Sequence, residues 1–204
     1  MRCKAAIGFV ALVVCAVLAR AADDAGFTSL FDGKSLDGWV GVNTDRFTVR
    51  DGVIVNAGGT GWLRSVKAYR NFEFQTEYRV VRAGSDSGIF FRATSESAPK
   101  APGWPLKCYQ LQIIDGDSLL MLFGHGAACM FDRNSDALKS SRKAQGEWQS
   151  LTLKVVGSRA EAWLNGTLIT VSDTISLPEG HIGLQGENGH LEWRGLKIKE
   201  LPPG

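Results

Sequence analysis

The feature that most constrains this chain is a strict alternation of apolar and polar side chains, clearest between residues 72 and 80. One parity carries Phe72, Phe74, Tyr78 and Val80, and the other carries only charged or amide side chains. A period of two residues places these sets on opposite faces of an extended strand, whereas an amphipathic helix needs a period of 3.6. The segment therefore predicts a half-buried antiparallel strand.

Turn signals and further alternating runs extend this pattern along the chain. Asn165-Gly166 and Asp51-Gly52 each separate two short runs, and both dipeptides tolerate the positive φ of a tight hairpin. Strands are also expected at 148–156, and at 181–185 and 191–199 as a closing pair. No segment after residue 25 keeps a helical period for three turns, so no helix is expected.

The density of predicted strands defines the fold class. Roughly ten strands without helices predict an all-β sandwich or barrel, and the alternation favours a sandwich of two antiparallel sheets. No linker, repeat or low-complexity run interrupts residues 25–204, so a single domain is expected there. Two irregular stretches, 94–107 and 124–146, exceed ordinary turns and are candidate loops around a site.

The N-terminus has the pattern of a secretory signal peptide. Arg2 and Lys4 precede the uncharged, largely apolar residues 5–19, and Ala19-Arg20-Ala21 has the small-x-small form of a cleavage site. A membrane anchor is the alternative, but the apolar run gives only about 22 Å of helix. A lipid attached to Cys15 is a second alternative. We expect residues 1–21 to be removed and the protein to be exported, to the periplasm or outside the cell, with no membrane span afterwards.

Cleavage changes both the charge and the cysteine count. The 204-residue chain has 23 Lys+Arg against 21 Asp+Glu, and the mature chain has 20 against 21, a net charge of −1. This balance argues against a nucleic-acid partner and is compatible with an uncharged sugar. The cysteines that remain, Cys108 and Cys129, form a disulfide or stay as two buried thiols.

Two residues in the irregular stretches are candidate site residues in their own right. His125 stands between two glycines, in a loop where an imidazole can act as an acid, a base or a ligand. Trp104 follows Pro102-Gly103, and its indole can either stack on a sugar ring or anchor the loop in the core. Both interpretations of Trp104 stay open.

Several segments, taken in order, resemble one known family. They are 26–39 (GFTSLFDGKSLDGW), 86–92 (DSGIFFR), 109–115 (YQLQIID), 146–148 (GEW), 163–166 (WLNG), 180–185 (GHIGLQ) and 192–194 (EWR). Together they resemble the DUF1080 family, also called the 3-keto-disaccharide hydrolase domain, over the whole mature chain. The resemblance implies a concanavalin-like jelly roll and an exported enzyme that cleaves 3-keto-glycosides.

That chemistry sets requirements for the site. A ketone at C3 acidifies the proton at C2; a base removes it, the enolate expels the group at C1, and water can add afterwards. The site needs a base, donors to O3 and a proton donor for the leaving oxygen. The implied catalytic candidates are Asp86, Arg92, Asp115 and Glu187. The implied substrate-binding candidates are Gln110, Gln112, Trp104, His125, Gln185 and Arg194.

Strand parity suggests that several of these candidates converge on a concave sheet, namely Arg92, Gln110, Gln112, Gln185 and Glu187. In the alternative, Arg92 and Arg194 pair with carboxylates such as Asp115 across strands. The resembled family usually carries Glu at the position of Gln110, and an amide cannot act as an acid or base. A non-catalytic carbohydrate-binding module and a structural sandwich are therefore competing functions. The sequence specifies neither a cofactor nor a metal.

Overall fold

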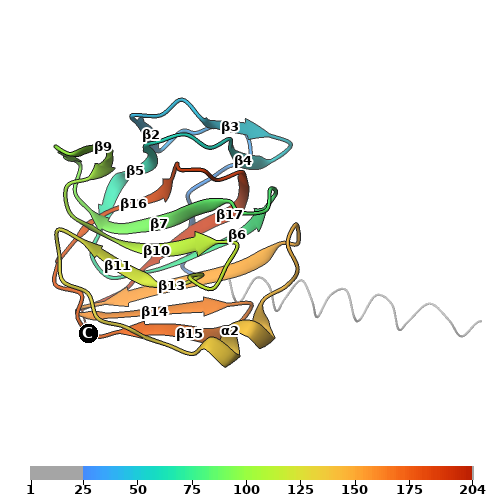
Figure 1. Ribbon diagram of the computed structural model, residues 1–204. Helices are drawn as coiled ribbons and strands as arrows, with labels where there is room; N and C mark the ends of the chain where they lie inside the picture. The colour runs from blue at the N-terminus through green and yellow to red at the C-terminus, as the bar shows by residue number, and fades with distance from the viewer. Residues whose placement is uncertain (1–24, 204) are drawn as a thin grey trace, which may run out of the picture.

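The computed structural model describes residues 25–203 and shows two antiparallel sheets stacked on each other (Figure 1). The six-stranded sheet has the order β11 (Leu122–His125), β10 (Cys108–Ile114), β7 (Asp86–Ala93), β16 (Gly180–Gln185), β5 (Trp62–Tyr69), β2 (Trp39–Val42). The nine-stranded sheet has the order β12 (Asp132–Arg133), β15 (Thr167–Ser172), β14 (Arg159–Leu164), β13 (Gln149–Val156), β6 (Phe72–Val80), β17 (Leu191–Glu200), β4 (Val53–Asn56), β3 (Phe47–Arg50), and β1 (Thr28–Ser29) also pairs with β17. Outside these sheets lie the β8 (Ser97–Ala98) and β9 (Ala101–Pro105) hairpin and the helix α2 (Ser135–Ser141).

The predicted alternation is confirmed along β6. Every second residue of this strand is buried, including Phe72, Phe74, Tyr78 and Val80, and the residues between them are half-buried. The buried set packs into the core between the two sheets. Burying a side chain such as Phe74 stabilises the fold by about 1.5–3 kcal/mol, so this one strand fixes which face of its sheet turns inward.

Both predicted hairpins are present. Asn165 and Gly166 have φ of 49° and 83° between β14 and β15, and Asp51 and Gly52 have φ of 49° and 77° between β3 and β4. Positive φ at both central residues matches the right-handed twist of the flanking strands. The all-β prediction and the sandwich of two antiparallel sheets, the jelly-roll class, are therefore confirmed.

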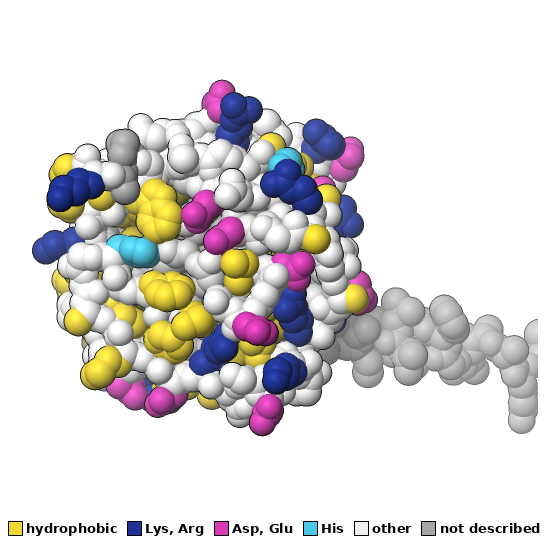
Figure 2. All heavy atoms as spheres, viewed as in Figure 1, with side chains coloured by type: hydrophobic (Ala, Val, Ile, Leu, Met, Phe, Trp, Pro, Cys, Tyr) yellow, Lys and Arg dark blue, Asp and Glu magenta, His cyan; other side chains and the backbone are white. Residues whose placement is uncertain are grey.

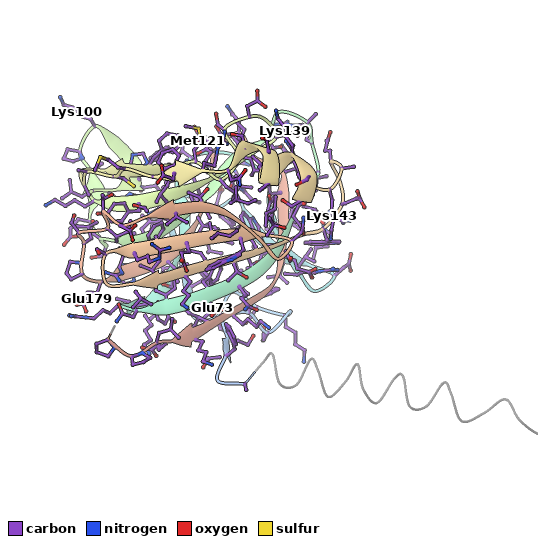
Figure 3. The ribbon with its side chains drawn as sticks, turned by 90° about the horizontal axis from the view of Figure 1, so that it is seen from below. Glu73, Lys100, Met121, Lys139, Lys143 and Glu179 are labelled. Atoms are coloured by element: carbon purple, nitrogen blue, oxygen red, sulfur yellow. The ribbon has the colours of Figure 1, made fainter. Side chains whose placement is uncertain are left out.

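The expected closing pair is wrong, because β16 and β17 belong to different sheets. β16 pairs with β5 and β7, whereas β17 pairs with β4 and β6. The short segment 186–190 therefore crosses from one layer to the other. Figure 3 shows the layers from below, with Met121 on the side of the six-stranded sheet and Glu73 on the side of the nine-stranded sheet.

Two further expectations need correction. The stretch 124–146 contains the helix α2, whose first turn is capped by the Asn134 side chain accepting from Ala137 N, and which buries Leu138. Seven residues are too few to produce a repeating apolar period, so the pattern could not reveal it. Cys108 and Cys129 are both free thiols, and the disulfide alternative is wrong.

The N-terminal predictions concern residues outside the described part of the chain. The signal peptide expected at 1–21 lies before residue 25, where the description begins. Within residues 25–203, no helix has the length and apolar character needed to cross a membrane.

Candidate functional site

Five polar side chains gather on the face of the six-stranded sheet that points away from the core. Ile89, Leu111 and Leu184 on the neighbouring strands β7, β10 and β16 take the opposite parity and lie in the core. We call the group on the outer face the acid–amide cluster; its members are Asp86, Gln110, Gln112, Gln185 and Glu187. Figure 2 looks onto this face and shows acidic and histidine side chains beside apolar ones.

Each carboxylate of the cluster is held by an amide. Gln112 Nε2 donates to Asp86 Oδ1 over 2.5 Å, and Gln185 Nε2 donates to Glu187 Oε2 over 2.6 Å. A carboxylate oxygen that carries no proton can only accept, so each contact fixes which end of the amide points toward the acid. The amide oxygens of Gln112 and Gln185 consequently point toward Gln110.

Gln110 occupies the centre of this arrangement. Its Nε2 donates to the amide oxygens of Gln112 and Gln185, the latter over 2.9 Å. Its Oε1 lies 2.8 Å from His125 Nε2, and an amide oxygen can only accept. His125 therefore carries its proton on Nε2, and its Nδ1, which no hydrogen bond from residues 25–203 reaches, is left as an acceptor.

The surroundings shift the protonation of these groups in a consistent direction. Burial raises the pKa of the Asp86 carboxyl, against the opposing effect of the Gln112 hydrogen bond. Burial also raises the pKa of Glu187, and the negative charge of Asp86 raises it further. Burial lowers the pKa of His125, which favours the neutral imidazole. Because each ionised carboxylate disfavours the other, one of them retains a proton at a higher pH.

Aromatic rings from β5, β7 and β9 lie near His125, beside the cluster. The β8–β9 hairpin places the half-buried Trp104 ring 5.1 Å from the His125 ring, edge to face. Phe90 lies beneath both, 5.6 Å from Trp104, and the almost fully buried Trp62 stands edge-on to Phe90. The anchoring role of Trp104 is confirmed by its packing on Phe90, and the stacking role stays a prediction that the exposed part of the ring allows. A partly exposed indole beside polar groups is suited to a sugar ring.

Three residues that the sequence did not single out hold this arrangement in place. A Cβ on Gly88 would lie 2.8 Å from Gln185 Oε1, so only glycine allows the glutamines to meet above β7. Ser87 Oγ and Asn56 Nδ2 both donate to the Gln185 carbonyl oxygen, over 2.7 and 3.0 Å. Ser87 and Asn56 share the parity of buried apolar residues, and a polar residue at such a position is the signal that could have identified them.

Three of the predicted site residues lie elsewhere. Asp115 forms an ion pair with Arg142, which follows α2. Arg194 stands in the other sheet, where its Nε is 2.7 Å from Glu77 Oε2. Its strand β17 was expected to pair with β16, but the two strands belong to different sheets, so Arg194 does not reach the site. The cross-strand ion-pair alternative is therefore the correct one for Arg194, with Glu77 rather than Asp115 as its partner.

Arg92 also leaves the site face, for a different reason. Its φ is 49°, and the register between β7 and β16 shifts next to it, between His181 and Gly183. This irregularity reverses the side-chain direction, so that Arg92 does not share a face with Phe90 as strict alternation requires. Its guanidinium instead contacts Leu177 O and Asn71 Oδ1. The expected convergence of Arg92 with the glutamines is thus wrong.

Within the described residues, no group of three or more His, Cys, Asp or Glu side chains is arranged to hold a metal ion. The acid–amide cluster itself offers acid–base and hydrogen-bonding chemistry, with two carboxylates whose pKa values are raised, a neutral imidazole and amide donors.

The fold and this site define a jelly-roll sandwich with a polar site on the outer face of one sheet. The chain belongs to the 3-keto-alpha-glucoside-1,2-lyase-like domain family, whose sequence pattern matches residues 26–199. A Bacteroides thetaiotaomicron protein named 3-keto-disaccharide hydrolase is 27% identical over 157 residues, which cover 65% of this chain and 53% of that protein. This chain thus spans about half the length of that curated relative.

Solved structures show the same fold. A Parabacteroides distasonis protein described as a candidate glycosyl hydrolase is 22% identical with a TM-score of 0.67, over 89% of this chain and 97% of that one. The carbohydrate-binding module CBM66 from Bacillus subtilis is 14% identical with a TM-score of 0.60, over 80% of this chain and 96% of that one. A Bacillus licheniformis beta-glucanase, 10% identical, gives a TM-score of 0.52, over 86% of this chain and 97% of that one. At these identities the likeness concerns the fold alone.

Proposed function

We propose that this protein cleaves the glycosidic bond of 3-keto-glycosides at the acid–amide cluster. The observation that carries the proposal is the pair Asp86 and Glu187, each held by one amide and both with a raised pKa, on the outer face of the six-stranded sheet in a chain of this family. The family membership and the curated relative support the substrate class.

The two carboxylates take different roles in the proposed reaction. Asp86 is the base that accepts the proton from C2, because the Gln112 hydrogen bond stabilises its ionised form. Glu187 is the acid, because both burial and the charge of Asp86 favour its protonated form. The electron pair of the C2–H bond forms the enolate, whose collapse breaks the C1–O bond, and the leaving oxygen takes the proton from Glu187. Water can then add to the resulting enone.

The surrounding groups hold the sugar. His125 Nδ1 is free to accept a hydrogen bond from a hydroxyl group, and the Trp104 ring offers an apolar surface beside it. Gln110 does no acid–base chemistry in this scheme. It orients Gln112, Gln185 and His125, so that the amide in place of the family's usual Glu serves as a fixed connector.

The decisive experiment is turnover of a 3-keto-α-glucoside with a chromogenic leaving group. Wild type is expected to release the leaving group, and Asp86→Asn and Glu187→Gln are each expected to lose most of the activity. Arg194→Gln is the matched control, because Arg194 lies in the other sheet. Absence of turnover by the wild type, with or without added divalent metal, would contradict the proposal.

A carbohydrate-binding module without catalysis is the second candidate, favoured by the amide at Gln110 and the half-buried Trp104. It predicts saturable calorimetric binding of an unmodified glycan, with about tenfold weaker affinity for Trp104→Ala and no turnover. Trp148→Ala is the control, because Trp148 contacts Arg194 on the opposite sheet. No heat with any glycan of a broad panel would contradict this alternative.

We also propose that the chain is exported as a single domain after removal of residues 1–21. The support is the sequence pattern of the N-terminus and the uninterrupted strand pattern from residue 25. N-terminal sequencing of protein from culture supernatant and periplasmic extract tests it. A chain that starts at Met1 and stays in the cytosol would contradict it.

A further inference from the structure

The arginine that the site does not use lies in an unusual environment. Arg92 lies near the end of β7 and has a φ of 49°, which non-glycine residues rarely adopt. On the neighbouring strand, a Cβ at Gly180 would lie 2.3 Å from the Arg92 carbonyl carbon, so glycine is required there. Strained backbone of this kind persists only where the surrounding structure enforces it, and it often marks a functional site.

The guanidinium of Arg92 is buried with much of its hydrogen-bonding capacity unused. The residue is 2% exposed, and its partners are Leu177 O and, over 3.4 Å, Asn71 Oδ1. Its Nε is buried and has no partner. An arginine carries five N–H donors, so a buried guanidinium with two acceptors leaves donors unsatisfied.

The charge of Arg92 is also unbalanced. Among the residues that the structure describes, no carboxylate lies within ion-pair distance of its guanidinium, and Glu179 contacts Arg70 instead. Burial and the nearby charge of Arg70 lower the pKa of Arg92 to about 10, whereas Tyr109 and Glu179, neither of them in ion-pair contact, oppose this shift. The side chain therefore remains a cation at neutral pH, and a buried cation without a counter-charge is costly.

A cavity of about 310 Å³ adjoins this guanidinium at the end of the sandwich where several turns meet. Its lining includes Arg70, Asn71, Arg92, Gly157, Ser176 and Pro203. Arg70 is exposed, with its Nη2 3.5 Å from Glu179 Oε2, a loose surface contact that another anion can replace. The volume is within the range of small-ligand pockets.

We propose that this cavity, which we call the arginine pocket, binds a small oxyanion between Arg92 and Arg70. The ligand group is a carboxylate, sulfate or phosphate, because guanidinium groups donate two parallel hydrogen bonds to such anions. The group comes either from a free inorganic anion or from an acidic sugar. The site is separate from the acid–amide cluster, since Arg92 does not share the face of Phe90, and it does not depend on the proposed function.

The test is a titration of ¹⁵N-labelled full-length protein, followed by amide chemical shifts at constant ionic strength. The probes are sodium sulfate, sodium phosphate and glucuronate, with chloride as the reference anion. We expect saturable shifts at Asn71, Gly157 and Ser176, with a Kd of about 1 mM or lower. Saturation by sulfate or phosphate alone identifies a free anion as the source, and tighter binding of glucuronate identifies an acidic sugar.

The variants change Arg70 rather than Arg92, because the exposed side chain can be replaced without disturbing the core. Arg70→Gln is expected to weaken binding about tenfold. Arg70→Glu places a carboxylate beside Arg92 and is expected to abolish binding. Arg46→Gln is the matched control, since Arg46 is similarly exposed (61% against 65%) and also pairs with a surface carboxylate. Shifts that never saturate, or that survive unchanged in Arg70→Glu, would overturn the proposal.

Discussion

The outer faces of the two sheets carry similar residue types and use them differently. On the nine-stranded sheet, Glu77 pairs with Arg194 and Glu192 with Arg79, in contacts that are partly exposed to solvent. On the six-stranded sheet, the side-chain partners of Asp86 and Glu187 are the amides of Gln112 and Gln185 rather than guanidinium groups. The first arrangement satisfies its charges, whereas the second leaves two carboxyl groups with raised proton affinity.

The partner of a carboxylate therefore decides what it can do. The Arg194 guanidinium lies 2.7 Å from the Glu77 carboxylate, so this acid is engaged in an ion pair. An amide orients Asp86 without neutralising it, so burial raises the pKa of this carboxyl. The proposed function accordingly assigns the chemistry to the six-stranded face, whereas Glu77 and Glu192 of the nine-stranded face form ion pairs.

The largest expected effect is a loss of turnover in variants of the six-stranded face that a variant of the nine-stranded face does not show. Asp86→Asn and Glu187→Gln keep the shape of the side chains and their amide contacts but remove the proton-transferring group. Each is expected to reduce turnover of a 3-keto-glycoside by about 10²–10⁴-fold, whereas Glu77→Gln is expected to leave it unchanged. Steady-state kinetics measures this, and equal losses in all three variants would erase the distinction.

The next prediction concerns the hydrogen bonds of Gln110, whose amide donates to Gln112 and Gln185 and accepts from His125. Gln110→Glu removes the donor to Gln112 and Gln185 and places a carboxylate beside His125 Nε2, which favours the imidazolium. The pKa of His125 is expected to rise, and turnover to fall about tenfold. A pH–rate profile and ¹⁵N shifts of the His125 ring measure both changes.

The ring spectra also test the wild type. They should show the Nε2–H tautomer of His125, and an Nδ1–H tautomer would contradict the inferred orientation of Gln110. Gln145→Glu is the control for Gln110→Glu, because Gln145 is exposed in the loop after α2 and should leave the His125 titration unchanged.

A smaller effect is expected in the pH dependence of stability. Asp86 and Glu187 have raised pKa values in the folded protein, so it holds protons that the unfolded chain releases above about pH 4. The free energy of unfolding therefore falls as the pH rises through the folded pKa values. The double variant Asp86→Asn, Glu187→Gln lacks this loss and should be more stable than wild type at pH 7, by about 2–4 °C in Tm.

Thermal denaturation followed by circular dichroism measures this difference. It should shrink toward pH 3, where both carboxyl groups are protonated in the folded and unfolded states. A double variant that is less stable than wild type at pH 7 would show that the carboxylates stabilise the sandwich rather than strain it.

The smallest effect is expected on the nine-stranded face. Arg194→Gln removes the ion pair with Glu77 and a guanidinium 4.0 Å from the centroid of the Trp148 ring. Partly exposed pairs contribute about 0.2–1 kcal/mol, so stability should fall by no more than that. Urea denaturation at low and high salt measures it, and a larger loss would mean that this face carries more of the fold's stability than its exposure suggests.

The sheets were predictable because they depend on short-range signals. Alternation in Phe72–Val80 and the Asn165-Gly166 and Asp51-Gly52 turns each follow from local backbone geometry. The separation of β16 from β17 was not predictable, because a connection of five residues serves equally well for a hairpin and for a crossing between sheets. Because β17 lies in the other sheet, the predicted place of Arg194 in the site was wrong as well.

The site was half predictable. Parity correctly placed Gln110, Gln112 and Gln185 on one face, since their strands are regular where they meet. It failed at Arg92, because an irregularity of register reverses a side chain without changing the sequence pattern. The raised pKa values of Asp86 and Glu187 were not predictable, because they depend on burial that arises only when the sheets assemble.

The order of strands in the six-stranded sheet bears on how the protein acquires activity. β16 inserts between β7 and β5, which precede it by some ninety residues or more, and it delivers Gln185 and the adjoining Glu187. Such distant pairing makes folding slow compared with local hairpins. A chain interrupted before residue 187 lacks Glu187, which is half of the acid pair, and also β17, which joins β6 to β4 in the nine-stranded sheet. Regain of catalysis during refolding would thus report the time at which β16 has paired with β7 and β5.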